Sequence, residues 1–318
     1  MEIKDIRIEN IELADERFRI AHFFSLDPLV LSIKKIGLIY PPVVTPRSGR
    51  LVIVTGWKRV LACRKIHFSS LPVFVLDEPE DSKAFRLSFL ENLTVRNFSL
   101  LEKAEVIGKL SEFGEGEREI IKTCLPLLHI PPTYDYYNLY MNIFRWELKE
   151  KELIHFQNVS LAVIERLVEI TSDERAVLYP YLWPLSVNKQ KELLEVIQEL
   201  SLKKGLSLRE ILESGNLKAV AEAENLSALQ KSDRIRKLLQ NIRFPKLSKR
   251  QGDFASAKKR MAWPEDIKIS PTPFFEDKTL HIEFSFQSPK DYLEKLSVLH
   301  EAAALKDFAE LFDISEDD

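Results

Sequence analysis

The sequence predicts an α+β protein made of several domains. With 318 residues, the chain is long enough for about two or three domains by the usual length prior. Apolar and β-branched runs alternate with helix-like segments only in residues 1–98, whereas residues 99–215 have a purely helical pattern. The composition, 45% hydrophobic and 30% charged, is typical of a soluble globular chain and excludes a disordered or collagen-like one.

Residues 1–98 are expected to form a small α/β domain. Short runs of apolar and β-branched residues predict strands at residues 42–45, 51–54 and 72–76. Helix-like segments lie before and between these runs, at residues 26–36 and 57–66. This alternation of strand and helix is the pattern of an α/β domain.

Residues 99–215 are expected to form an all-helical domain with a helix-turn-helix. Ser99 and Glu102 have the spacing at which a hydroxyl and a carboxylate satisfy each other's backbone N–H groups at a helix start. The helix-turn-helix is predicted as a leading helix, a second helix, a break and a recognition helix at residues 101–113, 115–128, 129–132 and 133–147.

On the recognition helix, the candidates for DNA contact are Asn138, Asn142 and Arg145. Asparagine can read an adenine edge, and arginine can bind a phosphate. Four tyrosines on the same helix have a spacing that also fits packing against neighbouring helices, and this alternative stays open.

Residues 216–260 are expected to form a basic helical connector. Between residues 228 and 260, eleven Lys or Arg residues stand against two Asp residues. Such a segment can neutralise DNA phosphates and release their counterions, although a solvated helix face has the same composition. The candidate DNA contacts here are Lys246, Lys249, Arg250, Lys258, Lys259 and Arg260.

Residues 261–318 are expected to form a small α+β module that dimerises. The charge balance reverses here, with fourteen acidic and five basic residues. Residues 279–286 alternate apolar and polar side chains, as a strand with one buried face does. Because a lone strand has unpaired edges, we expect it to pair with a second chain. Packing against residues 267–275 of the same chain is the alternative.

Two short motifs in the first domain suggest chemistry. Gly56, Lys58 and Arg59 open a helix, where free N–H groups, a close backbone approach and two cations suit a phosphate. Glu91 and Asn92 place a carboxylate beside an amide oxygen, a pair that suits Mg²⁺. The residues alone also allow a plainer interpretation, in which Gly56 only ends a strand and the two cations lie in solvent.

The order of these motifs resembles the N-terminal domain of ParB-type chromosome-partition proteins. The resemblance rests on Leu31-Ser32-Ile33, Gly37-Leu38-Ile39-Tyr40-Pro41, Gly56-Trp57-Lys58-Arg59 and Glu91-Asn92-Leu93, followed by Glu102 and Ala104. It implies a ParB/sulfiredoxin-like nucleotide-binding fold for residues 1–98. It also implies a helix-turn-helix DNA-binding domain for residues 99–215 and a dimerisation module within residues 261–318.

The resemblance further implies a DNA clamp operated by CTP and Mg²⁺, in DNA partition or gene regulation. The implied nucleotide contacts are Gly56, Lys58, Arg59, Glu91, Asn92 and Arg96, with Glu91 and Asn92 also holding the metal. The implied partners are DNA, a second copy of the chain and a partition ATPase. Trp57 stands where the family has an acid, so we expect a weak CTPase or none and assign no catalytic residue. Val95 stands where the family has an arginine, and Arg96 follows it.

Two other functions stay open. Free-serine kinases use a ParB-like scaffold to transfer phosphate to a small amino acid, and an adaptor would keep the fold without turning nucleotide over. The two cysteines suggest no disulfide framework, and the apolar runs are too short to span a bilayer. We therefore expect a cytoplasmic, nucleoid-associated protein that makes no membrane contact.

Overall fold

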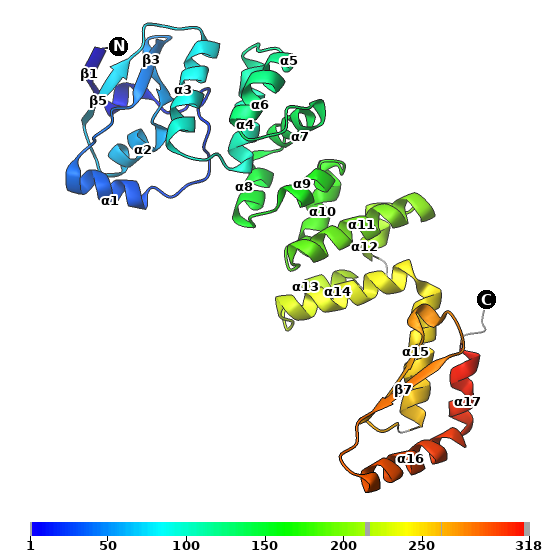
Figure 1. Ribbon diagram of the computed structural model, residues 1–318. Helices are drawn as coiled ribbons and strands as arrows, with labels where there is room; N and C mark the ends of the chain where they lie inside the picture. Colours follow the sequence, from blue (N-terminus) through cyan, green and yellow to red (C-terminus); the bar gives the residue numbers. More distant parts are fainter. Residues whose placement is uncertain (1, 214–216, 262, 315–318) are drawn as a thin grey trace. The chain divides into compact units, whose positions relative to one another are not determined.

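The computed structural model describes residues 2–213, 217–261 and 263–314. It divides into two compact units, Met1–Ser172 and Asp173–Asp318, which are described separately (Figure 1). Among the described residues, no helix is both long and apolar enough to cross a bilayer.

A five-stranded mixed sheet lies in the N-terminal part of the first unit, in the order β1-β5-β3-β4-β2. Its strands are β1 (Glu2–Arg7), β2 (Ile11–Glu12), β3 (Val43–Arg47), β4 (Arg50–Thr55) and β5 (Ser70–Val75). The pairs β1–β5 and β3–β4 are antiparallel, and the pairs β3–β5 and β2–β4 are parallel. The three predicted strands are confirmed. Strands β1 and β2 were not predicted, because β1 is a charge-rich edge strand and β2 is only two residues long.

Three helices belong to this α/β region, and they are α1 (Asp27–Ile36), α2 (Trp57–Lys65) and α3 (Asp81–Val95). The helices predicted at residues 26–36 and 57–66 are confirmed as α1 and α2. Sheet and α2 share one apolar core, in which Val44, Ile53, Val60 and Leu71 are fully buried. This core fixes the start of α2, where the first motif lies.

The rest of the first unit is helical. Its elements are the 3-10 turn η1 (Ile8–Asn10), α4 (Leu100–Glu112), α5 (Glu117–Glu119), the π-helical turn η2 (Ile120–Cys124), α6 (Leu125–Leu127), α7 (Tyr134–Phe144), α8 (Leu148–Phe156) and α9 (Leu161–Leu167). Ser99 and Glu102 form the expected reciprocal cap at the start of α4. The predicted leading and recognition helices correspond to α4 and α7. Pro126 lies in α6, between α4 and α7, and has no backbone N–H to donate. The turn of helix that precedes α6 is the wider π turn η2.

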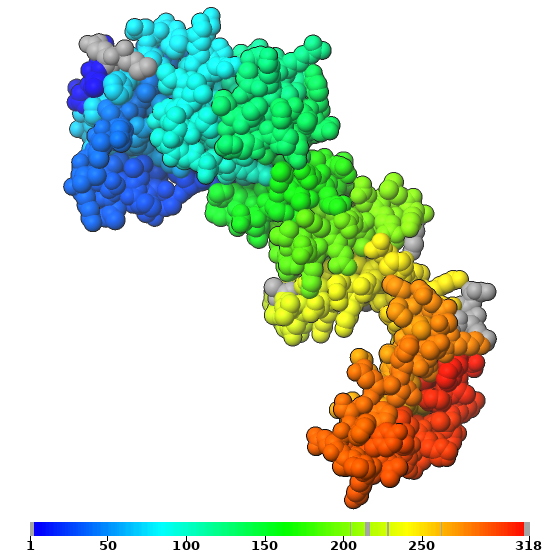
Figure 2. All heavy atoms as spheres, in the orientation of Figure 1, coloured from blue at the N-terminus to red at the C-terminus, as the bar shows by residue number. Residues whose placement is uncertain are grey.

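Helix α7 packs closely on α4. A Cβ on Gly108 of α4 would lie 2.1 Å from the Phe144 ring, so a side chain at position 108 would push α7 away. Tyr137 and Tyr140 are buried, which confirms the packing interpretation for these two tyrosines. Figure 2 shows the α/β region, blue to cyan, lying against the green helices of the first unit.

The second unit contains an array of helices followed by a small α+β module. The helices are α10 (Ser172–Leu182), α11 (Val187–Lys204), α12 (Leu208–Glu213), α13 (Leu217–Glu222), α14 (Ala228–Arg243), α15 (Pro245–Arg260), α16 (Pro289–Ala303) and α17 (Lys306–Asp313). The 3-10 turn η4 (Pro273–Phe275) lies between strands β6 (Ile267–Pro271) and β7 (Leu280–Phe284). The basic run at residues 228–260 is therefore helical, in α14 and α15.

The strand predicted at residues 279–286 is confirmed as β7, and the alternative of packing within the chain holds for one of its edges. It pairs antiparallel with β6 of the same chain, with Ile269 opposite Ile282. Strand β6 was not predicted, because a five-residue segment ending in proline gives a weak strand pattern. Helix α15 contributes Phe254 and Ala257 to the core beneath this hairpin, so the last third of the predicted connector packs with the C-terminal module.

Candidate functional site

The residues at the start of α2 contact different parts of the chain. Gly56 precedes the helix with φ +93°, and a Cβ there would lie 2.7 Å from Pro42 Cβ and 2.9 Å from Pro42 Cα. Only glycine allows both this conformation and this approach. Gly56 therefore serves first to bring the loop before β3 against the start of α2.

Trp57 lies in the core, with 7% of its surface exposed. The guanidinium of Arg19 lies over its ring at 5.4 Å, and no acceptor among the described residues reaches its buried Nε1. The residue that replaces the family's acid therefore presents no group to a ligand.

Arg59 holds the loop before β3. It donates hydrogen bonds from Nη1 to the carbonyl oxygens of Tyr40 and Pro41 at 3.0 and 3.3 Å, and its Nη2 pairs with Glu91 Oε1 at 3.0 Å. The hydroxyl of Thr55 donates to the other Glu91 oxygen at 2.7 Å. Arg59 and Glu91 are thus brought together as predicted, but they bind each other.

The second motif does not fit a Mg²⁺ site in this arrangement. Asn92 donates from Nδ2 to the Ser88 carbonyl at 2.9 Å and accepts from Arg96 Nε at 3.2 Å. A cation at Glu91 would have to displace the Arg59 guanidinium. Across residues 2–213, 217–261 and 263–314, no three His, Cys, Asp or Glu side chains gather as a metal site.

Lys58 and Arg96 meet at a cavity of about 220 Å³ between the α/β region and the helices that follow it. Its other lining residues are Ile20, His22, Phe23, Ser99, Leu101, Glu102, Glu105, Lys151 and His155. Arg96 Nη1 pairs with Glu102 Oε2 at 2.7 Å. Arg96 thus faces the cavity, whereas Val95, at the position of the family's arginine, is exposed.

Lys58 is half-buried, and its ammonium lies over the Phe24 ring at 4.8 Å. No carboxylate of the described residues lies within ion-pair distance of it. Burial, and then the charge of Arg96, lower the pKa of Lys58 below its ordinary value. The charge of a bound anion would offset both effects, so Lys58 is a candidate anion contact of the cavity.

Glu105 forms the opposite wall of the cavity. Its carboxylate lies 3.4 Å from His22 Nε2, 3.2 Å from Lys109 Nζ and 3.7 Å from Lys151 Nζ. Burial raises the pKa of Glu105, but the hydrogen bond from His22 and the two lysine charges hold it below its ordinary value. Glu105 is therefore ionised and already neutralised by its neighbours.

The predicted DNA contacts on α7 share its exposed face. Asn138, Asn142 and Arg145 are exposed, whereas the opposite face is buried on the neighbouring helices. This arrangement leaves all three side chains accessible to a duplex.

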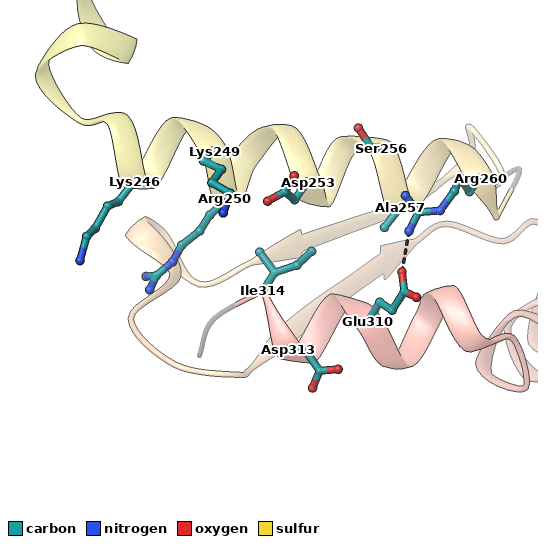
Figure 3. A pocket seen from close by; sticks show the side chains of 10 residues that line it. All are labelled: Lys246, Lys249, Arg250, Asp253, Ser256, Ala257, Arg260, Glu310, Asp313 and Ile314. Atoms are coloured by element: carbon teal, nitrogen blue, oxygen red, sulfur yellow. Dashed lines mark hydrogen bonds and ion pairs between the residues drawn. The ribbon is translucent and has the colours of Figure 1, made fainter. Parts of the chain in front are cut away.

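The second group of predicted DNA contacts lies on α15. Lys246, Lys249, Arg250 and Arg260 line a groove of about 590 Å³ that α17 borders with Glu310 and Asp313 (Figure 3). Arg260 is not available to DNA here, because Nε binds Asp307 at 2.7 Å and Nη2 binds Glu310 at 2.6 Å. Among the described residues, the four lysines of the group, Lys246, Lys249, Lys258 and Lys259, have no ion-pair partner.

Three cations on α14 belong to the predicted basic run but were not among the candidate DNA contacts. Arg234, Arg236 and Lys237 are exposed, and no ion pair joins them to a described residue. Arg243 of the same helix binds Glu199 at 2.6 Å. The count of basic residues included all four, but only the fold separates the paired cation from the others.

The α/β region, with its motifs placed as described, matches the family model for the ParB N-terminal domain over residues 1–93. Residues 1–93, the segment similar to this family, are called the ParB N-terminal domain here. Together with the relatives below, this match confirms the resemblance to ParB-type partition proteins.

The relatives of this domain include proteins named as chromosome-partitioning proteins and nucleoid occlusion proteins. A probable ParB of Borreliella burgdorferi is 30% identical over 100 residues, 31% of this chain and 38% of that protein. A probable ParB of Chlamydia trachomatis is 36% identical over 90 residues, 27% of this chain and 32% of that protein. Spo0J of Thermus thermophilus is 30% identical over 118 residues, 34% of this chain and 44% of that protein. The match thus spans less than half the length of each relative.

Two solved structures of a C-terminally truncated ParB from Caulobacter crescentus are similar at lower identity. The complex with the centromeric parS site has a TM-score of 0.35 at 14% identity and covers 60% of this chain and 98% of that chain. The complex with CTP-gamma-S has a TM-score of 0.27 at 16% identity and covers 56% and 98%. Neither superposition is close enough to carry an argument about this chain.

The ParB N-terminal domain does not enclose its cavity alone. Lys58 and Arg96 were predicted from motifs, but Lys151 and His155 of α8 also line the cavity and were missed. No local signal marks these two residues, since they lie on an ordinary amphipathic helix far along the chain from both motifs.

Proposed function

We propose that this protein is a ParB-like DNA-binding protein whose ParB N-terminal domain binds the phosphates of a nucleotide. The observation that carries the proposal is Lys58, a half-buried ammonium without a carboxylate partner among the described residues. It lies at a cavity between the ParB N-terminal domain and the helices that follow it. CTP is the nucleotide that the family resemblance implies. The role in the cell is DNA partition or gene regulation.

The size of the cavity supports binding of the phosphate end. Sites that enclose a whole drug-sized ligand have volumes of roughly 300–1,000 Å³. The cavity at Lys58 and Arg96 has about 220 Å³ and is lined mainly by charged and polar side chains. It therefore suits a polyphosphate, with the nucleoside lying outside it.

Weak or absent hydrolysis is part of the proposal. Trp57 is in the core and offers no carboxylate to position a water molecule. Both oxygens of Glu91 are occupied by Thr55 and Arg59, and the Glu102 carboxylate binds Arg96. Loss of one catalytic acid or base typically slows a reaction by about 10²- to 10⁴-fold. These contacts favour a nucleotide-binding adaptor as the second candidate.

DNA binding is supported by two exposed surfaces. The face of α7 carries Asn138, Asn142 and Arg145, which suit contacts to base edges and phosphate. The lysines of α15 and the cations of α14 suit a sequence-independent contact to the phosphate backbone. The free-serine-kinase alternative gains no comparable support.

Lys58→Gln is expected to weaken CTP binding by about 10- to 100-fold, because a charge-assisted hydrogen bond contributes roughly 1.5–3 kcal/mol. Isothermal titration of the full chain with CTP, ATP and GTP measures this loss and the preference for the base. Lys65→Gln is the matched control, since Lys65 lies on the same helix but pairs with Asp27 on the surface at 2.7 Å. Equal affinity in wild type and Lys58→Gln, or no CTP binding by the wild type, would contradict the nucleotide site.

Assembly into a homodimer through the C-terminal module is also proposed. Large apolar side chains remain exposed on α16 and the segment before it: Phe286 (56%), Tyr292 (38%), Leu293 (65%) and Leu296 (37%). A contiguous apolar patch of this kind on a module is typical of an interaction surface.

Replacing Leu293 and Leu296 together with lysine is expected to convert the dimer into a monomer, because two buried charges would oppose association. Sedimentation velocity at several protein concentrations measures the change. Leu202→Lys is the control, as Leu202 is 81% exposed on α11. A double variant that sediments as the wild-type dimer would place the interface elsewhere.

A further inference from the structure

We infer that helix α8 completes the phosphate site, with Lys151 as a ligand contact that lies outside the ParB N-terminal domain. The inference rests on the proposed nucleotide binding and adds a residue and a consequence to it. Lys58 and Arg96 form one side of the cavity, and Lys151 and His155 of α8 contribute to another. A polyphosphate in this cavity would therefore contact two parts of the chain that are far apart in the sequence.

The placement of Lys151 suits this role. Its side chain is 12% exposed, and its Nζ donates to the Phe144 carbonyl at 2.6 Å and lies 3.7 Å from Glu105 Oε2. An ammonium has three protons to donate. One is used by the carbonyl and one is directed to the carboxylate, which leaves a third for a phosphate oxygen.

The charges that line the cavity also favour a bound anion. Three basic side chains line it, Lys58, Arg96 and Lys151, against the carboxylates of Glu102 and Glu105. Each carboxylate already pairs with a cation, at 2.7 Å for Glu102 with Arg96 and 3.7 Å for Glu105 with Lys151. Lys58 is left with excess positive charge in a half-buried site, where a phosphate would stabilise it most.

The walls of the cavity are held in place by one face of α4. Glu102 binds Arg96, and Glu105 binds His22. One turn later, Lys109 donates to the carbonyl oxygens of Glu16 and Arg19 at 2.9 and 2.6 Å. These positions, spaced by three and four residues, lie along the same helix face. The ParB N-terminal domain is thus docked on α4, and the cavity has a defined width.

A bound polyphosphate would therefore restrain α8 as well as occupy the N-terminal domain. Lys151 binds the carbonyl of Phe144, the last residue of the recognition helix α7. Any ligand that fixes Lys151 also fixes the end of α7. Nucleotide binding and the position of the predicted recognition helix α7 are coupled through the side chain of Lys151.

The test compares four proteins: wild type, Lys151→Gln, Lys151→Arg and Lys149→Gln. Lys149 is an exposed lysine of the same helix that does not line the cavity. Isothermal titration with CTP and with inorganic triphosphate measures affinity. Hydrogen exchange of residues 148–156, with and without CTP, measures the restraint on α8.

We expect Lys151→Gln to weaken the binding of both probes by about 10- to 100-fold, as the loss of a charged hydrogen bond does. Lys151→Arg retains most of the affinity, and Lys149→Gln all of it. CTP slows the exchange of residues 148–156 in the wild type but not in Lys151→Gln. Thermal unfolding without ligand checks that Lys151→Gln remains folded.

The outcomes separate this inference from the proposed function. If the wild type binds CTP and Lys58→Gln weakens it but Lys151→Gln does not, the nucleotide site stands and the role of α8 is wrong. If Lys151→Gln weakens binding only by speeding the ligand-free exchange of α8, Lys151 is structural and the inference is also wrong. A wild type that binds neither probe overturns both.

Discussion

Replacing Lys246, Lys249, Lys258 and Lys259 together with glutamine is expected to flatten the salt dependence of DNA binding. Each phosphate contact contributes about 0.9 to the slope of log affinity against log salt concentration, so the four lysines contribute up to about 3.6. The affinity should fall on every sequence alike, because phosphate contacts carry no sequence information. Fluorescence anisotropy of a labelled random duplex, titrated at several salt concentrations, measures the slope.

The matched control is Arg260→Gln, a change of the same charge on the same helix. Arg260 binds Asp307 and Glu310, so its charge is already neutralised within the module. The slope should therefore remain at the wild-type value in Arg260→Gln. If Arg260→Gln reduces the slope by about 0.9, the share expected of one lysine, the ion pairs with α17 do not neutralise Arg260. The assigned DNA-binding surface is then incorrect.

This contrast between Arg260 and the lysines illustrates what the sequence could and could not provide. Features encoded by neighbouring residues were predicted correctly, such as the reciprocal cap of Ser99 and Glu102 and the strand at residues 279–286. The partner of a charge is a property of the tertiary fold. The acids that bind Arg260 follow it by 47 and 50 residues, and no local pattern links them.

The same limit applies to the candidate site. The motifs located Lys58 and Arg96, which do face the cavity, and Arg59 and Glu91, which bind each other instead. A motif fixes which residues are near in the sequence, but the direction of each side chain depends on packing. Trp57 is the clearest example, since its large apolar ring is buried in the core and presents no group to a ligand.

Gly56→Ala is expected to destabilise the ParB N-terminal domain by about 2–5 kcal/mol. A non-glycine residue at positive φ costs roughly 1–2 kcal/mol, and forcing extra atoms into a packed contact costs roughly another 1–3 kcal/mol. The new Cβ would lie 2.7 and 2.9 Å from the Cβ and Cα of Pro42, atoms that no rotamer change can move. Either the loop before β3 or the start of α2 must shift, and the hydrogen bonds of Arg59 to that loop would be strained.

Gly49→Ala separates the two contributions, because Gly49 also has positive φ (+79°) but no atom within 4 Å of the added Cβ. Gly49 lies in the turn between β3 and β4, so both variants report on the same sheet. Native-state hydrogen exchange of β4 measures the stability of each. The difference between the two losses is the cost of the contact with Pro42. If both variants lose the same stability, the loop before β3 moves away from the new Cβ at no cost in free energy. The contact between Gly56 and Pro42 would then not fix the geometry around Lys58.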